Sequence, residues 1–127
     1  MADWIYYNPN PEGQRIGDCV IRAISAVMQK DWDKVYIGLV MQGYVDKDMP
    51  SSNSVWSRYL KQRGFRMSLL PDMCPGCLTI DDFAREHPKG KFILGTGQHA
   101  VAVIDGKIYD TWDSRGEIPI YYFEEAT

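Results

Sequence analysis

The sequence predicts an α+β fold in which N-terminal helices pack on a C-terminal antiparallel sheet. The part before residue 64 carries apolar residues at helical spacing, whereas the part after residue 90 consists of β-prone runs separated by turns. Within the second part, Asp105-Gly106 is the strongest hairpin signal, because both residue types tolerate the positive φ angles of a tight β-turn. Helices first and hairpin-connected strands afterwards are typical of an α+β domain.

The first half of the chain is expected to form a short strand and three helices. Residues 4–7 are aromatic and β-prone, and the Asn- and Pro-rich run at 8–13 interrupts regular structure. The predicted helices run from Asp18 to about Gln29, from Asp31 to Gly43, and from Ser52 or Asn53 to Gly64. The apolar stripes of the last two helices predict four buried aromatic residues, namely Trp32, Tyr36, Trp56 and Tyr59.

The second half is expected to add strands and one short helix. Thr79 and Asp82 are spaced as a capping box, and the helix that they begin should end at His87-Pro88. Residues 71–77 are predicted to form a loop. The expected strands cover residues 65–70, 91–96, 100–104, 107–112 and 118–123.

Length and composition indicate a single domain over residues 1–127. Of the 127 residues, 45% are hydrophobic, enough for a core that buries roughly two thirds of the unfolded surface. The net charge of −3 and the lack of a basic run argue against nucleic-acid or membrane partners. Without a signal peptide or a membrane-spanning segment of ~18 apolar residues, we expect a cytoplasmic protein. An odd number of cysteines, 3, also fits a reducing compartment.

Two residues carry the chemistry that this sequence suggests. Cys19 falls in the first turn of the first predicted helix, where the helix dipole favours the thiolate. His99 stands at the head of the strand predicted at 100–104. Each alone would more often be structural, because free cysteines are commonly buried and histidines commonly hydrogen-bonded. Together, a thiol and an imidazole on these elements are the parts of a nucleophile-base pair.

The predicted hairpin selects an acidic partner for His99. A two-residue turn at Asp105-Gly106 places Asp110 on the same face as His99 and diagonally across from it, with Trp112 directly opposite. A three-residue loop with a bulge would instead bring Asp113 to that face. Both carboxylates remain candidates, and turn preferences favour Asp110.

Acyl transfer also needs donors for the oxyanion that forms in the transition state. The backbone N–H of Cys19 at the free end of its helix is one candidate. A side-chain amide upstream would be the second, and Gln14 is placed to supply it. Asn8 and Asn10 lie in the same loop and compete for this role.

This arrangement resembles the papain-like cysteine peptidase superfamily, in the order Cys, His, Asp along the chain. The nearest likeness is to peptidase domains that process bacteriocin leader peptides and to small cysteine peptidases of bacteria and their phages. The similar pieces are Asp18-Cys19 at the helix start, residues 92–99, and the strand pair that ends in Asp110. The hairpin at residues 103–110 also resembles transglutaminase-like domains.

The resemblance implies a papain-like fold and a thiol hydrolase of peptide or amide bonds. It makes Cys19 the nucleophile, His99 the base and Asp110 the orienting acid, with Gln14 in the oxyanion hole. It implies a peptide or protein substrate, and no cofactor or metal is expected. Two alternatives stay open: a transglutaminase or deamidase with the same triad, and a non-catalytic module that binds peptides. The oligomeric state is not predicted.

The pair Cys74 and Cys77 has CxxC spacing, which also occurs in zinc sites and in dithiol switches. A structural zinc ion needs four ligands, and only His87 is available besides the cysteine and histidine assigned above. A redox CxxC normally begins a helix within a βαβ unit, which this sequence lacks. We therefore interpret the pair as part of a structural loop.

Overall fold

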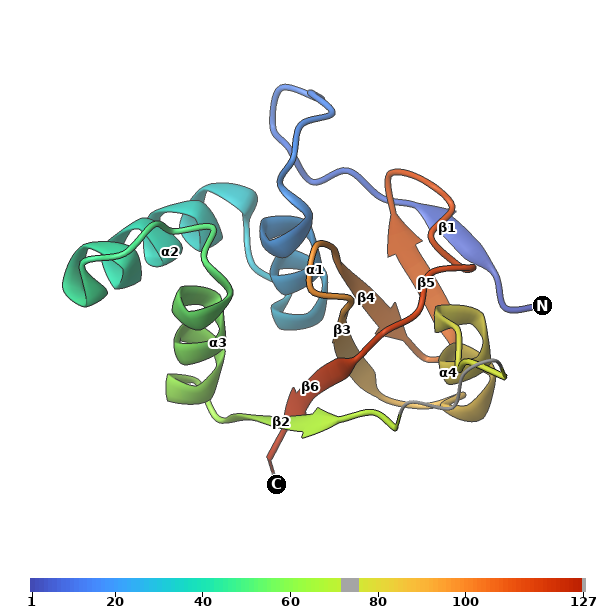
Figure 1. Cartoon of the computed structure of the whole chain (residues 1–127). Helices are drawn as coiled ribbons and strands as arrows, with labels where there is room; N and C mark the ends of the chain where they lie inside the picture. Colours follow the sequence, from blue (N-terminus) through green and yellow to red (C-terminus); the bar gives the residue numbers. More distant parts are fainter. Residues whose placement is uncertain (72–75, 127) are drawn as a thin grey trace.

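The computed structural model describes residues 1–71 and 76–126, which form a six-stranded sheet with helices on both faces (Figure 1). This confirms the α+β class. The helices are α1 (Cys19–Met28), α2 (Trp32–Asp46), α3 (Asn53–Gln62) and α4 (Ile80–Glu86). The strands are β1 (Trp4–Tyr6), β2 (Phe65–Leu69), β3 (Lys91–Gly95), β4 (Ala100–Ile104), β5 (Lys107–Asp110) and β6 (Tyr121–Glu125). No helix in these ranges is long and apolar enough to cross a membrane.

The sheet is mixed rather than purely antiparallel, which corrects one part of the prediction. Its strand order is β1-β5-β4-β3-β6-β2, and β1 runs parallel to β5 while all other neighbours are antiparallel. β1 is followed by an irregular loop and α1, so no hairpin joins it to an antiparallel neighbour. It pairs with the free edge of β5, where the N–H of Ile108 donates to the carbonyl of Asp3.

The hairpin between β4 and β5 has the predicted two-residue turn. Asp105 has a φ of 50° and Gly106 a φ of 76°, the two positive angles of a type I′ turn. Ile104 pairs with Lys107 across the turn, as expected. The same register places Asp110 at the end of β5, close to the start of β4 where His99 lies. The prediction of the hairpin register is therefore confirmed.

Helix α2 extends three residues beyond Gly43, where the sequence had indicated its end. A Cβ atom at position 43 would lie 2.7 Å from the carbonyl oxygen of Asp48, so only glycine allows the chain to fold back this closely. The helix ends instead at Asp46, followed by the C-cap Lys47, whose φ of 57° is left-handed. Gly43 therefore serves close packing rather than helix termination.

Two apolar clusters cover the two faces of the sheet. One joins α1, α2 and α3 to inward residues such as Ile93, Ala102 and Phe123. The other packs α4 against the opposite face. Trp56 and Tyr59 of α3 are buried, as predicted. Tyr36 is 44% exposed and Trp32 half-buried, so the prediction that they are core residues is wrong.

Helix α4 begins as the sequence predicts. Thr79 Oγ1 accepts a hydrogen bond from the N–H of Asp82, and the Asp82 carboxylate accepts one from the N–H of Thr79. This reciprocal pair is a capping box with Asp in the usual position of Glu. Of the CxxC pair, Cys74 lies outside the described residues, so the interpretation of that pair as a structural loop remains a prediction.

Candidate active site

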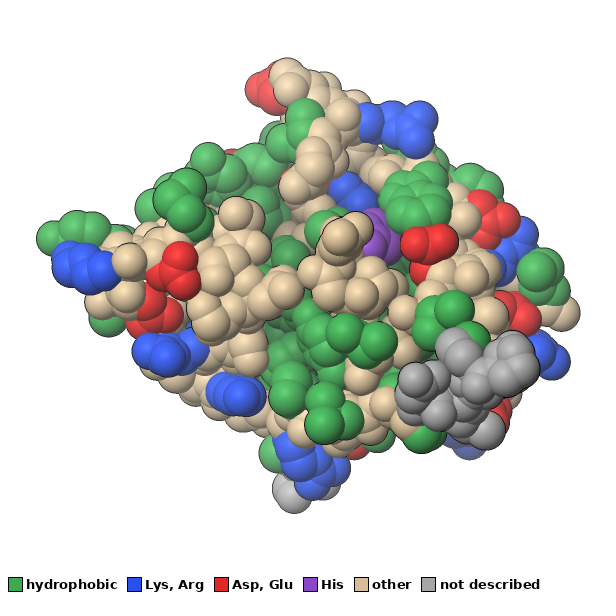
Figure 2. Space-filling model, in the orientation of Figure 1, with side chains coloured by type: hydrophobic (Ala, Val, Ile, Leu, Met, Phe, Trp, Pro, Cys, Tyr) green, Lys and Arg blue, Asp and Glu red, His purple; other side chains and the backbone are tan. Residues whose placement is uncertain are grey.

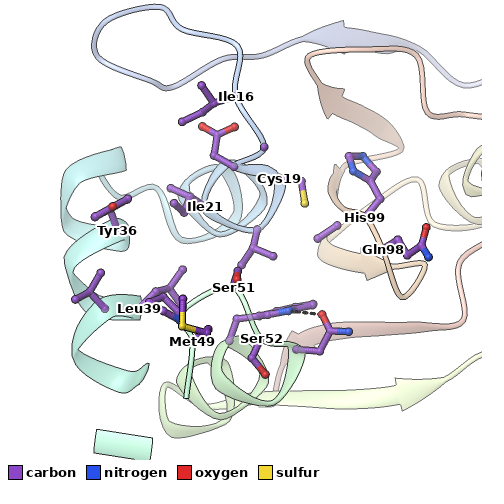
Figure 3. Close-up of a pocket in the computed structure, with 18 of the residues that line it drawn as sticks. Ile16, Cys19, Ile21, Tyr36, Leu39, Met49, Ser51, Ser52, Gln98 and His99 are labelled. Atoms are coloured by element: carbon purple, nitrogen blue, oxygen red, sulfur yellow. Dashed lines mark hydrogen bonds between the residues drawn. The ribbon is translucent and has the colours of Figure 1, made fainter. Parts of the chain in front are cut away.

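Cys19 is the first residue of α1, and its side chain is partly buried. Figure 3 shows its side chain on the side of α1 that faces His99, which approaches from the segment that leads into β4. The thiol also interacts with the backbone N–H of Ala100, the first residue of that strand. The structure therefore brings together the helix start and the strand head that the sequence singled out.

His99 is held between the thiol and a carboxylate. Its Nε2 donates a hydrogen bond to Oδ2 of Asp110 over 2.7 Å, an orientation that leaves Nδ1 for Cys19. Asp113 is not the partner, since its carboxylate pairs with the guanidinium of Arg115 over 2.8 Å. The hairpin register had favoured Asp110, and the geometry of the structure agrees with that choice.

The pKa values of Cys19 and His99 shift in opposite directions. Burial raises the pKa of the Cys19 thiol, but hydrogen bonds with His99 and with the N–H of Ala100 outweigh burial, and the pKa falls below its ordinary value. Burial lowers the pKa of His99, but hydrogen bonds to Asp110 and Cys19 outweigh it and raise that pKa to about 9. These shifts favour a thiolate beside an imidazolium at neutral pH.

Asp110 is 1% exposed and each of its oxygens has more than one donor. Oδ2 accepts hydrogen bonds from His99 and from Ser114 Oγ, the latter over 2.7 Å. Oδ1 accepts from the backbone N–H of Thr111 over 2.8 Å and from Arg22 Nη2 over 3.0 Å. Burial raises the pKa of Asp110, but the bonds from His99 and Ser114 outweigh it, so the carboxyl stays ionised.

Arg22 is a site residue that the sequence analysis missed. It lies in α1, is only 5% exposed, and donates to Asp18 as well as to Asp110. Asp18 in turn accepts a hydrogen bond from Trp32 Nε1 over 2.8 Å. The i,i+4 spacing of Asp18 and Arg22 at a helix start was the signal that could have revealed half of this network.

This network also changes the role of Asp18. The sequence predicted a side-chain cap for α1, but Asp18 makes no side-chain hydrogen bond to the helix backbone. Its carboxylate is directed to Arg22 and Trp32 instead. Among the described residues, the backbone N–H groups of Cys19 and Val20 have no hydrogen-bond acceptor. The free N–H of Cys19 remains available to an oxyanion.

Gln14 is not brought to the other three predicted site residues. Its side chain is exposed, and its backbone carbonyl accepts a hydrogen bond from Asn8 Nδ2 over 3.1 Å. Asn10 uses its side-chain oxygen to accept the N–H of Glu12. These local bonds fold the loop back on itself, so the roles of Gln14, Asn8 and Asn10 in an oxyanion hole remain predictions without a supporting contact.

Trp112 packs against the ring of His99. Its ring centroid lies 4.8 Å from that of the imidazole, as the hairpin register predicts for opposite residues. The indole remains 38% exposed. Trp112 therefore limits access of water to His99 while presenting an aromatic surface to the solvent side.

A cavity of about 770 Å³ opens beside Cys19, and apolar side chains dominate its wall. Cys19 and His99 lie at one end, while Ile21, Tyr36 and Leu39 line the part away from them (Figure 3). The surface of the molecule is visibly hollowed there, with hydrophobic side chains in the depression (Figure 2). Asp18 is the one carboxylate in its lining, and it is already bonded to Arg22 and Trp32, so the mostly apolar wall suits an uncharged, apolar group.

Comparisons with known proteins add no relative. No protein-family model, curated protein or solved structure matches this chain. What can be inferred about its function therefore comes from the geometry and chemistry of the site.

Proposed function

We propose that this chain is a thiol-dependent hydrolase that cleaves a peptide or amide bond by acyl transfer through Cys19. The observation that supports this proposal most directly is that His99 lies between the thiol of Cys19 and the buried carboxylate of Asp110. A lowered thiol pKa beside a raised imidazole pKa is the pattern of an activated nucleophile. The resemblance to papain-like peptidases supports the same assignment.

In the first half-reaction the thiolate attacks the carbonyl carbon of the scissile amide. The electron pair of the carbonyl moves to oxygen, and the backbone N–H of Cys19 is placed to donate to that oxyanion. As the tetrahedral intermediate collapses, the C–N bond breaks and His99 gives its proton to the departing nitrogen. The products are a free amine and a thioester on Cys19.

In the second half-reaction His99 acts as a base. The neutral imidazole takes a proton from water, whose oxygen attacks the thioester carbonyl and displaces the thiolate. The carboxylic acid leaves and the thiolate-imidazolium pair is restored. Asp110 accepts the hydrogen bond from Nε2–H of His99 throughout, so that Nδ1 of His99 always faces the reacting atoms.

The substrate that the site favours is a peptide with an apolar group on its acyl side. The cavity beside Cys19 is lined by apolar and aromatic residues, and burial of such a group there is favourable by about 25 cal/mol per Å².

If the acceptor were an amine instead of water, the same residues would perform transglutamination. Release of ammonia without peptide cleavage would identify that reaction or a deamidation.

The test is the reactivity of Cys19 combined with hydrolysis. Iodoacetamide labelling followed by peptide mapping should give a rate at about pH 6 that is at least about tenfold higher in the native protein than in a His99→Gln variant. A pool of fluorogenic peptides should be hydrolysed by the native protein and not by Cys19→Ser. Equal labelling rates together with no hydrolysis would overturn the proposal and favour a peptide-binding module without catalysis.

A further inference from the structure

Resting on the hydrolase proposed above, we propose that the leaving-group side of the site selects a positively charged residue, and that Glu117 is the residue that selects it. A second cavity of about 740 Å³ lies next to the first. His99 and Gln98 line both cavities, but Cys19 lines only the first. The wall of the second cavity also includes Trp112 and Glu117.

The positions of the thiol and the imidazole determine which part of a substrate each cavity receives. Cys19 forms a bond to the acyl carbon, so the acyl portion lies in the cavity that contains Cys19. His99 protonates the departing nitrogen, so the leaving portion extends past His99 and away from the thiol. The second cavity occupies that position, and a peptide would therefore lie with the residue after the scissile bond beside Glu117.

The second cavity has an exposed carboxylate in its wall, whereas the carboxylate of the first, Asp18, is buried and paired with Arg22. Glu117 is exposed and has no ion-pair partner among the residues that the structure describes. The nearby Arg115 is occupied by Asp113 and by the carbonyl of Ala2, and no Lys or Arg lines this cavity. The half-exposed ring of Trp112 offers a second favourable surface to a cation.

The backbone holds Glu117 in a defined place relative to the triad. Its N–H donates to the carbonyl of Ser114 over 3.0 Å, and its carbonyl accepts from the N–H of Ile80 at the start of α4 over 2.9 Å. Ser114 also donates its hydroxyl to Asp110 over 2.7 Å. The segment that carries Glu117 is thus anchored both to α4 and to the carboxylate that orients His99, which fixes the spacing between the charge and the reacting bond.

The experiment uses three quenched fluorescent peptides that share one apolar acyl-side sequence and differ only after the scissile bond. Lys, Met and Glu at that position keep a similar side-chain length while changing the charge. We expect kcat/KM for the Lys peptide to exceed that for the Met peptide by roughly fivefold, as one partly exposed ion pair would give, and the Glu peptide to be the poorest. The readout is the ratio of kcat/KM for the Lys peptide to kcat/KM for the Met peptide. Incomplete folding of a variant lowers both values by the same factor and leaves this ratio unchanged.

Glu117→Gln should bring the Lys to Met ratio close to one, and Glu117→Lys should make the Glu peptide the better substrate. Glu125→Gln is the matched control, since it makes the same change in net charge at an exposed position outside both cavities and should keep the native ratio. Hydrolysis of all three peptides at equal rates by the native protein would overturn this inference alone. No hydrolysis of any peptide, with an unreactive Cys19, would overturn the proposed hydrolase and this inference with it.

Discussion

Arg22 Nη2 lies 3.0 Å from Oδ1 of Asp110, and through that carboxylate it is connected to His99, whose Nε2 lies 2.7 Å from Oδ2. Helix α1 therefore carries the thiol at its first residue and, one turn later, the cation that holds the orienting acid. With Asp18 at the other side of Arg22, negative and positive groups alternate along the network. This alternation compensates charges that would be costly to bury singly.

Removing the cation from this network should destabilise the fold strongly. In Arg22→Met, the carboxylates of Asp18 and Asp110 would stay buried without their shared partner, and we expect the free energy of unfolding to fall by about 3–5 kcal/mol. Urea denaturation measures this loss. Arg58→Met is the matched control, because Arg58 is largely exposed and its ion pair with Asp46 should contribute less than about 1 kcal/mol. Equal losses in the two variants would contradict a special role of Arg22.

Neutralising the acid of the triad should affect the reaction more than the fold. Asp110→Asn would present an amide to Nε2 of His99 and favour the wrong tautomer, so we expect kcat to fall by about 10³ to 10⁴. The measurement is steady-state hydrolysis of the best fluorogenic peptide. Asp113→Asn, a change in an exposed carboxylate that faces Arg115, should stay within about threefold of the native rate. A larger loss in Asp113→Asn than in Asp110→Asn would reverse the assignment.

The opposite pKa shifts of His99 and Cys19 should make their contributions to stability depend on pH in opposite directions. Unfolded, His99 loses its proton near pH ~6.5 and Cys19 near ~8.5. In the fold, the pKa of Cys19 is lowered and that of His99 is raised to about 9. The raised pKa of His99 gives stability that is fully present below ~6.5, and the lowered pKa of Cys19 gives stability that is fully present above ~8.5.

Each contribution is lost as the pH moves through the folded pKa of its group. Above ~8.5 the native state binds more protons than the unfolded chain, so stability is lost as the pH rises through the His99 pKa of about 9. The Cys19 contribution is instead lost as the pH falls from ~8.5 through the lowered pKa of the thiol. Urea midpoints across this range, compared with those of His99→Gln, test the profile. A loss above ~8.5 that persists unchanged in His99→Gln would refute this origin.

Gly43 offers a test in which packing and helix propensity predict opposite signs. Alanine is about 1 kcal/mol better than glycine inside an exposed helix. At position 43, however, the added Cβ would meet the Asp48 carbonyl at 2.7 Å, and we expect Gly43→Ala to destabilise the protein by about 1–3 kcal/mol. Thermal unfolding measures the effect. Gly116→Ala, where the new methyl meets nothing within 4 Å, should be nearly neutral.

Local signals in the sequence were sufficient to predict several elements and the proximity of His99 and Asp110. The Asp105-Gly106 turn determines the register of β4 and β5, and that register places Asp110 rather than Asp113 beside His99. The capping box at Thr79 likewise depends only on residues three apart. These features follow from the sequence because turn type, period and capping are settled by neighbouring residues.

The tertiary structure decided what depends on segments far apart in the chain. The bond from Arg22 to Asp110 joins residues 88 positions apart, and the parallel pairing of β1 with β5 joins the first strand to the fifth. Gly43 and Tyr36 were misjudged because periodicity does not show which helix face meets a neighbour. The sequence thus determined the elements and the positions of Cys19, His99 and Asp110 on them. Packing decided that Arg22 contacts Asp110, because contacts between distant segments are not encoded in the local pattern of either residue.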